Sequence, residues 1–234
     1  MAITVGNTTA SRGPAAEAAT MTFAHDSNGT FLVTTGQWFR PRTPSSYTYN
    51  GTGMSQAAYS ASTYDAVIYY LASPTGGSNN CVLTLDSTSG ITGSAISLSG
   101  VNASPLGNTT TATGTSNSPS TALTTTAANS YIINSIYRNN SQTMTAGGSQ
   151  VEFQDNADLV YGTEGGGASY LACTSVTSYN MSWSWSTSTD WSHAVAEFKE
   201  ASSTTIKTWN GIVRANLKSL NGTLSANIKK INGI

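Results

Sequence analysis

Apolar and polar residues alternate in short runs along most of the first 200 residues. Val, Ile, Tyr, Phe and Trp supply the apolar positions, and several runs place every second side chain on one face. β-Branched and aromatic side chains in such runs favour strands over helices. The expected strands are residues 21–24, 31–35, 46–49, 66–71, 81–85, 95–98, 131–137, 151–153, 168–172, 180–185 and 194–198.

Turn-forming residues separate these runs, as at Asn28-Gly29, Gly147-Gly148 and residues 165–167. The strongest hairpin signal is Asn50-Gly51, because both residue types readily take the positive φ of a two-residue turn. Short strands at roughly ten-residue spacing, without a long amphipathic helix between them, favour antiparallel sheets. We therefore predict an all-β domain over residues 1–200, an antiparallel two-sheet sandwich of jelly-roll or immunoglobulin-like type.

Two stretches of this region lack a clear strand pattern. Residues 108–126 consist almost entirely of Ser, Thr, Asn and Ala, with Gly114 and Pro119 among them. This composition predicts a long exposed connection, with one polar strand near residues 122–126. Residues 10–20 are expected to form a loop or one helical turn.

Residues 201–234 form a basic C-terminal tail in which a six-residue phrase recurs every eleven residues. Residues 206–211, 217–222 and 228–233 each read apolar, Lys, any residue, apolar, Asn, Gly. Eleven residues fit three helical turns, but each Gly inside a helix costs about 1 kcal/mol. Asn-Gly suits a turn or a helix end better. We expect short helical or strand segments that end at each Asn-Gly and become ordered only against a body or a partner.

Charge separates the same two regions. Only 9% of the residues are charged, against about a quarter in ordinary globular proteins. Residues 1–200 carry eleven acidic and five basic side chains, a net charge of −6, and the tail carries five basic and no acidic ones, a net charge of +5. This separation indicates either a tail that meets an acidic surface or charges that only keep the tail in solution. The tail cations are too sparse to indicate nucleic-acid binding.

The two cysteines and the ends of the chain suggest no secretory context. Cys81 and Cys173 lie in apolar runs, where buried free thiols are expected rather than a disulfide. Residues 1–6 are too polar for a signal peptide. No run approaches the ~20 apolar residues of a membrane helix. We expect a protein made in the cytoplasm that does not enter a membrane.

Candidate catalytic and metal-binding groups are few. His25 and His193 lie in strand-like runs and no Gly-x-Ser-x-Gly motif occurs, so structural or surface roles are expected for both. Asp155, Asp158 and Glu164 could supply calcium ligands or a carboxylate pair, but a polar turn explains them better because the full loop pattern is missing. No Cys or His spacing indicates zinc. We expect no catalytic site, no metal and no cofactor.

Trp183 and Trp185 invite a different hypothesis. They are two residues apart and therefore share one face of a strand. Facing outward, they would form a glycan-binding platform on which sugar rings stack. Facing inward, they would belong to the core, which is the favoured arrangement because large aromatic side chains dominate sandwich cores.

Several phrases carry a resemblance to a known family. They are residues 3–9 (ITVGNTT), 48–54 (TYNGTGM), 67–77 (VIYYLASPTGG), 95–107 (AISLSGVNASPLG) and 191–198 (WSHAVAEF). In this order they resemble a β-sandwich module that is common in bacteriophage and bacterial surface proteins. The phrase Ile-Lys-Lys-Ile-Asn-Gly at the C-terminus is similar to repeats attached to many phage virion proteins.

The resemblance implies a non-enzymatic virion component, either a capsid decoration protein or part of a fibre or tail appendage, assembled in the host cytoplasm with other virion proteins. We hypothesise a homo-oligomer, such as a trimer, that the tail anchors or joins. The tail residues expected to bind partners are Ile206, Lys207, Trp209, Leu217, Lys218, Leu220, Ile228, Lys229 and Ile231. The alternative hypothesis is a carbohydrate-binding or adhesin module that uses Trp183 and Trp185, and a glycan hydrolase is the third.

Overall fold

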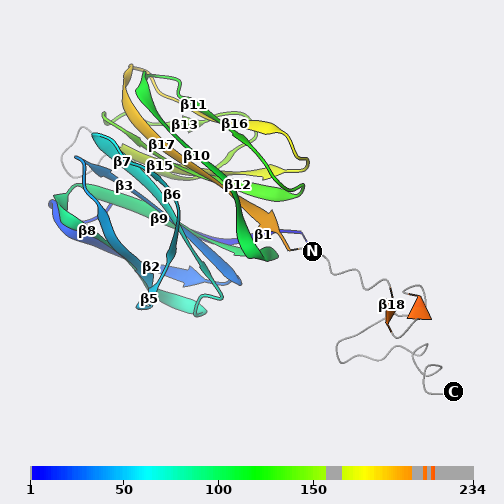
Figure 1. The fold of residues 1–234 in the computed structure, drawn as a ribbon. Helices are drawn as coiled ribbons and strands as arrows, with labels where there is room; N and C mark the ends of the chain where they lie inside the picture. The colour runs from blue at the N-terminus through cyan, green and yellow to red at the C-terminus, as the bar shows by residue number, and fades with distance from the viewer. Residues whose placement is uncertain (1, 157–164, 202–207, 210–211, 214–234) are drawn as a thin grey trace. The chain divides into compact units, whose positions relative to one another are not determined.

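The computed structural model describes residues 2–156, 165–201, 208–209 and 212–213 (Figure 1). Contacts divide the chain into two units, Met1–Ala201 and Ser202–Ile234. Every helix or strand assigned in the described ranges is a β-strand, and every strand pair is antiparallel. The predicted all-β class with antiparallel sheets is confirmed.

The first half of the large unit forms two sheets. Its strands are β1 (Thr4–Ser11), β2 (Ala18–Ser27), β3 (Phe31–Phe39), β4 (Pro44–Tyr49), β5 (Thr52–Gly53), β6 (Ser55–Ser60), β7 (Tyr64–Ala72), β8 (Gly77–Ser89) and β9 (Ile91–Ser99). One sheet has the order β1-β9-β3-β7-β6 and the other the order β2-β8-β4-β5. Tyr49 pairs with Thr52 across Asn50 and Gly51, whose φ values are 48° and 74°, so the predicted Asn-Gly hairpin is confirmed.

The second half repeats this arrangement. Its strands are β10 (Val101–Ser116), β11 (Ser120–Thr124), β12 (Ser130–Arg138), β13 (Thr145–Ala146), β14 (Val151–Asn156), β15 (Gly165–Cys173), β16 (Ser178–Ser184) and β17 (Thr189–Glu200). The sheets have the orders β10-β17-β12-β15-β14 and β11-β16-β13. The sequence predicts one two-sheet sandwich over residues 1–200, whereas the structure has two sandwiches, one in each half.

The strand registers of the two halves also agree. Adding 100 to both residue numbers of any β3–β9 pair gives a β12–β17 pair, so that Phe31 pairs with Leu98 and Tyr131 with Phe198. The same shift converts the β3–β7 pairs from Phe31–Ala72 to Trp38–Asp65 into β12–β15 pairs. Within these ladders the halves share the triplet Tyr-Leu-Ala, at 70–72 and 170–172. The two halves therefore share their strand pairing and their pattern of burial, but few of their side chains are identical.

The two five-stranded sheets pack face to face, which gives the unit four layers (Figure 1). In β3, Leu32 and Trp38 pack into the core that the first half's two sheets enclose. Val33, on the opposite face of β3, belongs to a cluster with Ile133 and Phe198 from the second half. Strands β3, β9, β12 and β17 are consequently buried on both faces. This explains why they contain longer runs of apolar and small residues than a one-sided strand would.

Uncharged polar side chains occupy part of the interface between the five-stranded sheets, and we call this group the polar seam. Gln37 Nε2 donates to Ser135 Oγ at 2.6 Å, and Gln154 Nε2 donates to Gln37 Oε1 at 3.0 Å. Thr35 Oγ1 also donates to Gln154 Oε1 at 3.2 Å. Because buried polar groups need partners, these bonds fix how the halves align.

The seam is approximately two-fold symmetric at its ends. Strands β6 and β14 end at Ser60 and Asn156, and each of these residues bonds to the opposite half. Ser192 Oγ donates to Ser60 Oγ at 2.8 Å, and Asn156 Nδ2 donates to Thr92 Oγ1 at 2.6 Å. Thr92 and Ser192 occupy equivalent positions in β9 and β17. The end of each edge strand therefore bonds to the equivalent position of the opposite half, and the second half is the donor in both bonds.

A single residue, Gly100, connects the two halves, since β9 ends at Ser99 and β10 begins at Val101. The Gly100 carbonyl accepts a hydrogen bond from Ala201 N at 2.7 Å. The end of the second half is thereby fixed to the junction between the halves.

Residues 165–167, expected as a turn, are instead the first residues of β15, and Gly167 pairs with Ile136. A Cβ atom at Gly166 would collide with the side chains of Thr92 and Gln37 in the polar seam. The glycines therefore allow the two sheets to approach closely. The prediction of a turn was wrong because glycine serves close packing here as well as turns.

Residues 108–126 do not form the long exposed connection that their composition predicts. Strand β10 runs through Ser116 and pairs with β17 from Thr109–Ala196 to Ser116–Thr189. The polar strand expected near 122–126 is β11, which begins two residues earlier. The prediction failed because β10 is an edge strand whose exposed face carries threonines, which favour strands without giving an apolar alternation. Residues 12–17 form the expected loop, without a helical turn.

Candidate functional site

Both histidines are buried and join the two sheets of their own sandwich. His25 of β2 bonds through Nδ1 to Thr9 Oγ1 and through Nε2 to Ser97 Oγ, each at 2.9 Å. His193 of β17 bonds through Nδ1 to Thr121 Oγ1 of β11, also at 2.9 Å. Burial lowers the pKa of His25, and it lowers the pKa of His193 to about 3. Both rings are therefore neutral near pH 7 and act as structural links, as the sequence predicts.

Two buried carboxylates hold loops in place. Glu197 accepts hydrogen bonds from Thr126 N at 2.8 Å, Ala127 N at 3.0 Å and Asn108 N at 3.0 Å. Burial alone would raise the pKa of Glu197, but these bonds, with one from the Thr126 hydroxyl, lower it. In the first half, Asp65 accepts bonds from the backbone of residues 42 and 62, and burial raises its pKa despite them. Each carboxylate therefore serves to hold a loop against its own sandwich.

Of the acidic residues considered for calcium or catalysis, Asp155 alone lies in the described ranges. Asp155 accepts a bond from Met144 N at 3.2 Å, and burial raises its pKa while that bond and Arg138 oppose the rise. Asp158 and Glu164 lie outside the described residues. Within the described ranges, no three His, Cys, Asp or Glu side chains are grouped so that they could hold a metal ion.

Trp183 and Trp185 face inward. Their side chains are 1% and 6% exposed and pack with Ile136 and Met144. Trp183 Nε1 donates to Asn134 Oδ1 at 2.9 Å. The structure thus has the core arrangement that the sequence favours, and neither ring presents a face on which a sugar could stack.

The cysteines are free and buried, as predicted. Burial raises the pKa of the Cys81 thiol to about 12 and that of Cys173 to about 11. Neither is therefore an activated nucleophile near neutral pH. In the part of the chain that the structure describes, no helix has the length and apolar character needed to cross a membrane.

Of the tail residues expected to bind partners, only Trp209 is described. It belongs to β18 (Thr208–Trp209), which pairs with β19 (Ile212–Val213), and Trp209 is opposite Ile212. The remaining eight positions lie outside the described residues: Ile206, Lys207, Leu217, Lys218, Leu220, Ile228, Lys229 and Ile231.

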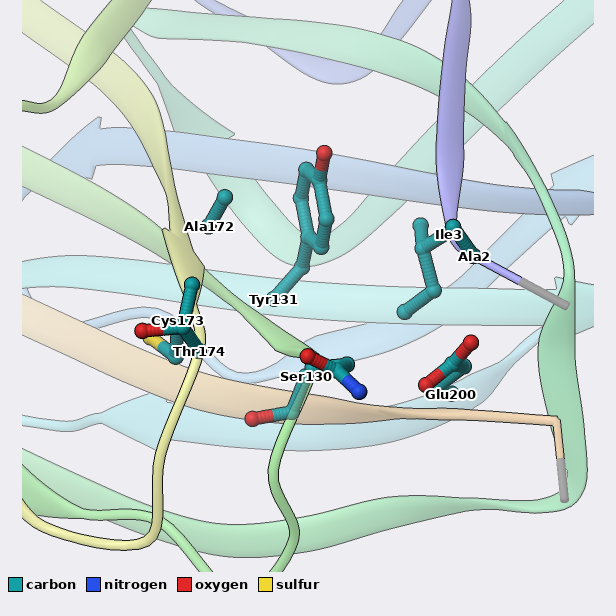
Figure 2. A pocket seen from close by; sticks show the side chains of 9 residues that line it. Ala2, Ile3, Ser130, Tyr131, Ala172, Cys173, Thr174 and Glu200 are labelled. Atoms are coloured by element: carbon teal, nitrogen blue, oxygen red, sulfur yellow. The ribbon is translucent and has the colours of Figure 1, made fainter.

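One pocket stands apart from these structural groups. It has a volume of about 290 Å³ and is lined by residues 2–3, 129–131 and 172–174 together with Glu200. These residues lie just before β1, at or just before the start of β12, at or just after the end of β15, and at the end of β17. In Figure 2 the Tyr131 ring lies between Ala172 and Ile3, and the Glu200 carboxylate is on the Ile3 side. The pocket therefore combines an apolar wall with one acidic group.

The chemistry of this pocket fits binding better than catalysis. Its lining contains no Lys, Arg or His, and the Cys173 thiol has a raised pKa. The Tyr131 ring is fixed by stacking on Tyr170, with 5.8 Å between the ring centroids. Sequence reasoning missed the pocket because its four segments are far apart along the chain and none has a recognisable motif.

Comparisons with protein-family models, with curated proteins and with solved structures gave no match to this chain. The site must therefore be interpreted from its own geometry.

Proposed function

We propose that this protein is a non-enzymatic structural component of a phage virion, either a capsid decoration protein or part of a fibre or tail appendage. It assembles in the host cytoplasm with other virion proteins, and its basic tail anchors it or joins copies into a homo-oligomer. The resemblance of the body and of the repeat tail to phage proteins motivates this proposal.

A finer reading of the fold supports it. Consecutive main strands of the first half alternate between the two sheets, from β1 to β4 and again from β7 to β9. This order, with β1-β9-β3-β7 facing β2-β8-β4, is that of a jelly roll, and the second half repeats it. Jelly rolls build viral capsid and lectin domains, so the proposed fold agrees with a virion role.

The observation that carries the proposal is the contrast between the body's surface and the tail's sequence. Among the described residues, the large hydrophobic side chains that are exposed are Val151, at 48%, and Val176, at 58%. A body with so little exposed apolar area has few places for a stable contact of its own. The tail repeats the pattern of apolar residues beside lysine that such a contact needs. This contrast supports assembly through the tail.

The alternative of carbohydrate binding has lost its main support, because Trp183 and Trp185 are core residues. The groups described above do not support an enzymatic role, because none of them places a base and a nucleophile together in a cleft.

Deletion of residues 203–234 tests the proposal. The unit Met1–Ala201 contains its own core and hydrogen bonds, so the shortened protein should stay folded and soluble but should no longer join the particle. Co-expression with the virion proteins, followed by quantification of the protein in purified particles, measures this. Full incorporation of the shortened protein would refute the role of the tail.

A further inference from the structure

The pocket at Tyr131 has the size and polarity to hold one branched aliphatic side chain with a cation beside it. An apolar cavity of about 150 Å³ already binds benzene, and this pocket measures about 290 Å³. Ile3 and Tyr131 supply apolar surface, and Glu200 supplies a carboxylate at one side. An apolar group placed next to an ammonium group would satisfy both parts.

The tail of this chain carries that combination three times. Ile206-Lys207, Leu217-Lys218 and Ile228-Lys229 each place a branched aliphatic side chain beside a lysine. The tail has a net charge of +5 and residues 1–200 a net charge of −6, so long-range attraction also favours the encounter.

The number of repeats favours a partner from another copy. The pocket has room for one aliphatic–lysine pair, so at least two of the three pairs in each tail remain for other molecules. A tail with several such pairs can link several bodies, and each further contact is strengthened because the first holds the chains together.

The geometry points to the following assignment, which rests on the assembly role proposed for the tail. The pocket formed by Ile3, Tyr131, Ala172 and Glu200 is a socket for an aliphatic–lysine pair in the repeat tail of a second copy of this chain. The aliphatic side chain enters beside the Tyr131 ring, and the lysine ammonium pairs with the Glu200 carboxylate.

The first test fills the socket in the full chain. Ala172 is exposed and lines the pocket, so Ala172→Trp should occupy the space without disturbing the core. Ala72 is the matched control, because it is exposed and pairs with Phe31 as Ala172 pairs with Tyr131. Sedimentation velocity over a range of protein concentrations measures self-association. We expect Ala172→Trp to weaken association at least ten-fold and Ala72→Trp to leave it unchanged.

The second test reverses the charge. Glu200→Lys should weaken association, and the combined change of Lys207, Lys218 and Lys229 to Glu should restore it in the Glu200→Lys background. Glu200→Gln should have a smaller effect, about two- to five-fold, as is typical of a solvent-accessible ion pair. Added salt should weaken the wild-type association in the same direction. Equal unfolding temperatures of the variants exclude a loss of fold as the cause.

Three outcomes would overturn the assignment. The first is identical association of the wild type and Ala172→Trp. The second is a full chain that stays monomeric at every concentration. The third is a monomer whose socket binds a synthetic peptide of residues 226–233 only after the monomer's own tail has been mutated. That result would mean that the socket holds the tail of the same molecule. If Ala172→Trp associates normally but deletion of residues 203–234 still prevents incorporation into particles, the socket is refuted and the proposed function stands.

Discussion

The two halves of the large unit have the same strand order and register but bury different side chains at equivalent positions. Trp38 in β3 corresponds to Arg138 in β12, and Ser97 in β9 corresponds to Glu197 in β17. All four residues are fully buried. The β12–β17 ladder therefore keeps the register of the β3–β9 ladder although it has charged residues where the β3–β9 ladder has neutral ones.

The hydrogen bonds at these positions show what each buried side chain requires. Trp38 Nε1 donates to Arg42 O, and Arg138 Nη1 donates to Asn140 O, so both side chains bond to a carbonyl in the loop that follows their strand. The burial of the Glu197 carboxylate is tolerated because it accepts hydrogen bonds from backbone N–H groups of a nearby turn. Alternating burial sets the register, and a buried polar group is tolerated where local backbone groups meet its hydrogen-bonding needs.

The largest difference between the halves should appear at Glu197. Glu197→Ala leaves the amides of residues 108, 126 and 127 without their acceptor, and each unsatisfied buried donor costs about 1–3 kcal/mol. We expect a loss of about 4 kcal/mol in the free energy of unfolding, and of about 1 kcal/mol for Ser97→Ala, whose hydroxyl bonds to one nitrogen of His25. Urea unfolding followed by circular dichroism measures both. Equal losses would contradict the prediction, because they would show that the several bonds of Glu197 stabilise the fold no more than the single bond of Ser97.

The next largest difference concerns acid. The pKa of folded His193, about 3, lies below its ordinary value of 6.5, so the unfolded chain binds a proton that the folded chain does not. The stabilisation is present above pH 6.5 and is lost as the pH falls toward 3, with a slope of up to about 1.4 kcal/mol per pH unit. His193→Gln should remove this slope. The free energy of unfolding of the wild type and of His193→Gln, measured from pH 7 to pH 4, tests this. An unchanged slope in the variant would contradict the prediction.

His25 provides the comparison for that experiment. Its pKa is also lowered by burial, and its ring has bonds at both nitrogens. Its stabilisation is likewise lost below pH 6.5, and His25→Gln should remove a separate part of the slope.

The smallest difference is expected at the ends of the polar seam. Asn156 Nδ2 donates to Thr92 Oγ1 at 2.6 Å and to Ser11 O at 2.8 Å, whereas Ser60 Oγ accepts from Ser192 Oγ at 2.8 Å and donates to Ala112 O at the longer distance of 3.4 Å. We expect Asn156→Ala to lower the free energy of unfolding by about 2 kcal/mol and Ser60→Ala by about 1 kcal/mol. Chemical denaturation of the two variants in parallel gives the comparison. A larger loss for Ser60→Ala would mean that the lengths of these hydrogen bonds do not determine how much each residue stabilises the fold.

The sequence predicts the parts of this fold in which burial leaves an alternating or apolar trace. Strands such as β3, β7 and β12 lie where their Val, Ile and Tyr residues indicate, and the Asn50-Gly51 hairpin follows from the φ preferences of those residues. Edge strand β10 was missed because its threonines face solvent, which removes the hydrophobic signal.

The division into two sandwiches leaves a fainter trace. The triplet at 70–72 and 170–172 is a sequence sign of the repeated register, and three residues are too few to stand out in a chain of 234. The pocket could not be found from the sequence, because its walls meet only when β1, β12, β15 and β17 are brought together.

The one-residue connection at Gly100 has a consequence for how strongly the halves must attract each other. Even short flexible linkers hold two modules at an effective concentration on the order of millimolar, and a single residue between β9 and β10 confines the second sandwich more tightly. The interface therefore remains closed without the affinity that two free chains would need. Because the tether holds the halves together, the hydrogen bonds of the polar seam are needed only to favour one alignment over another.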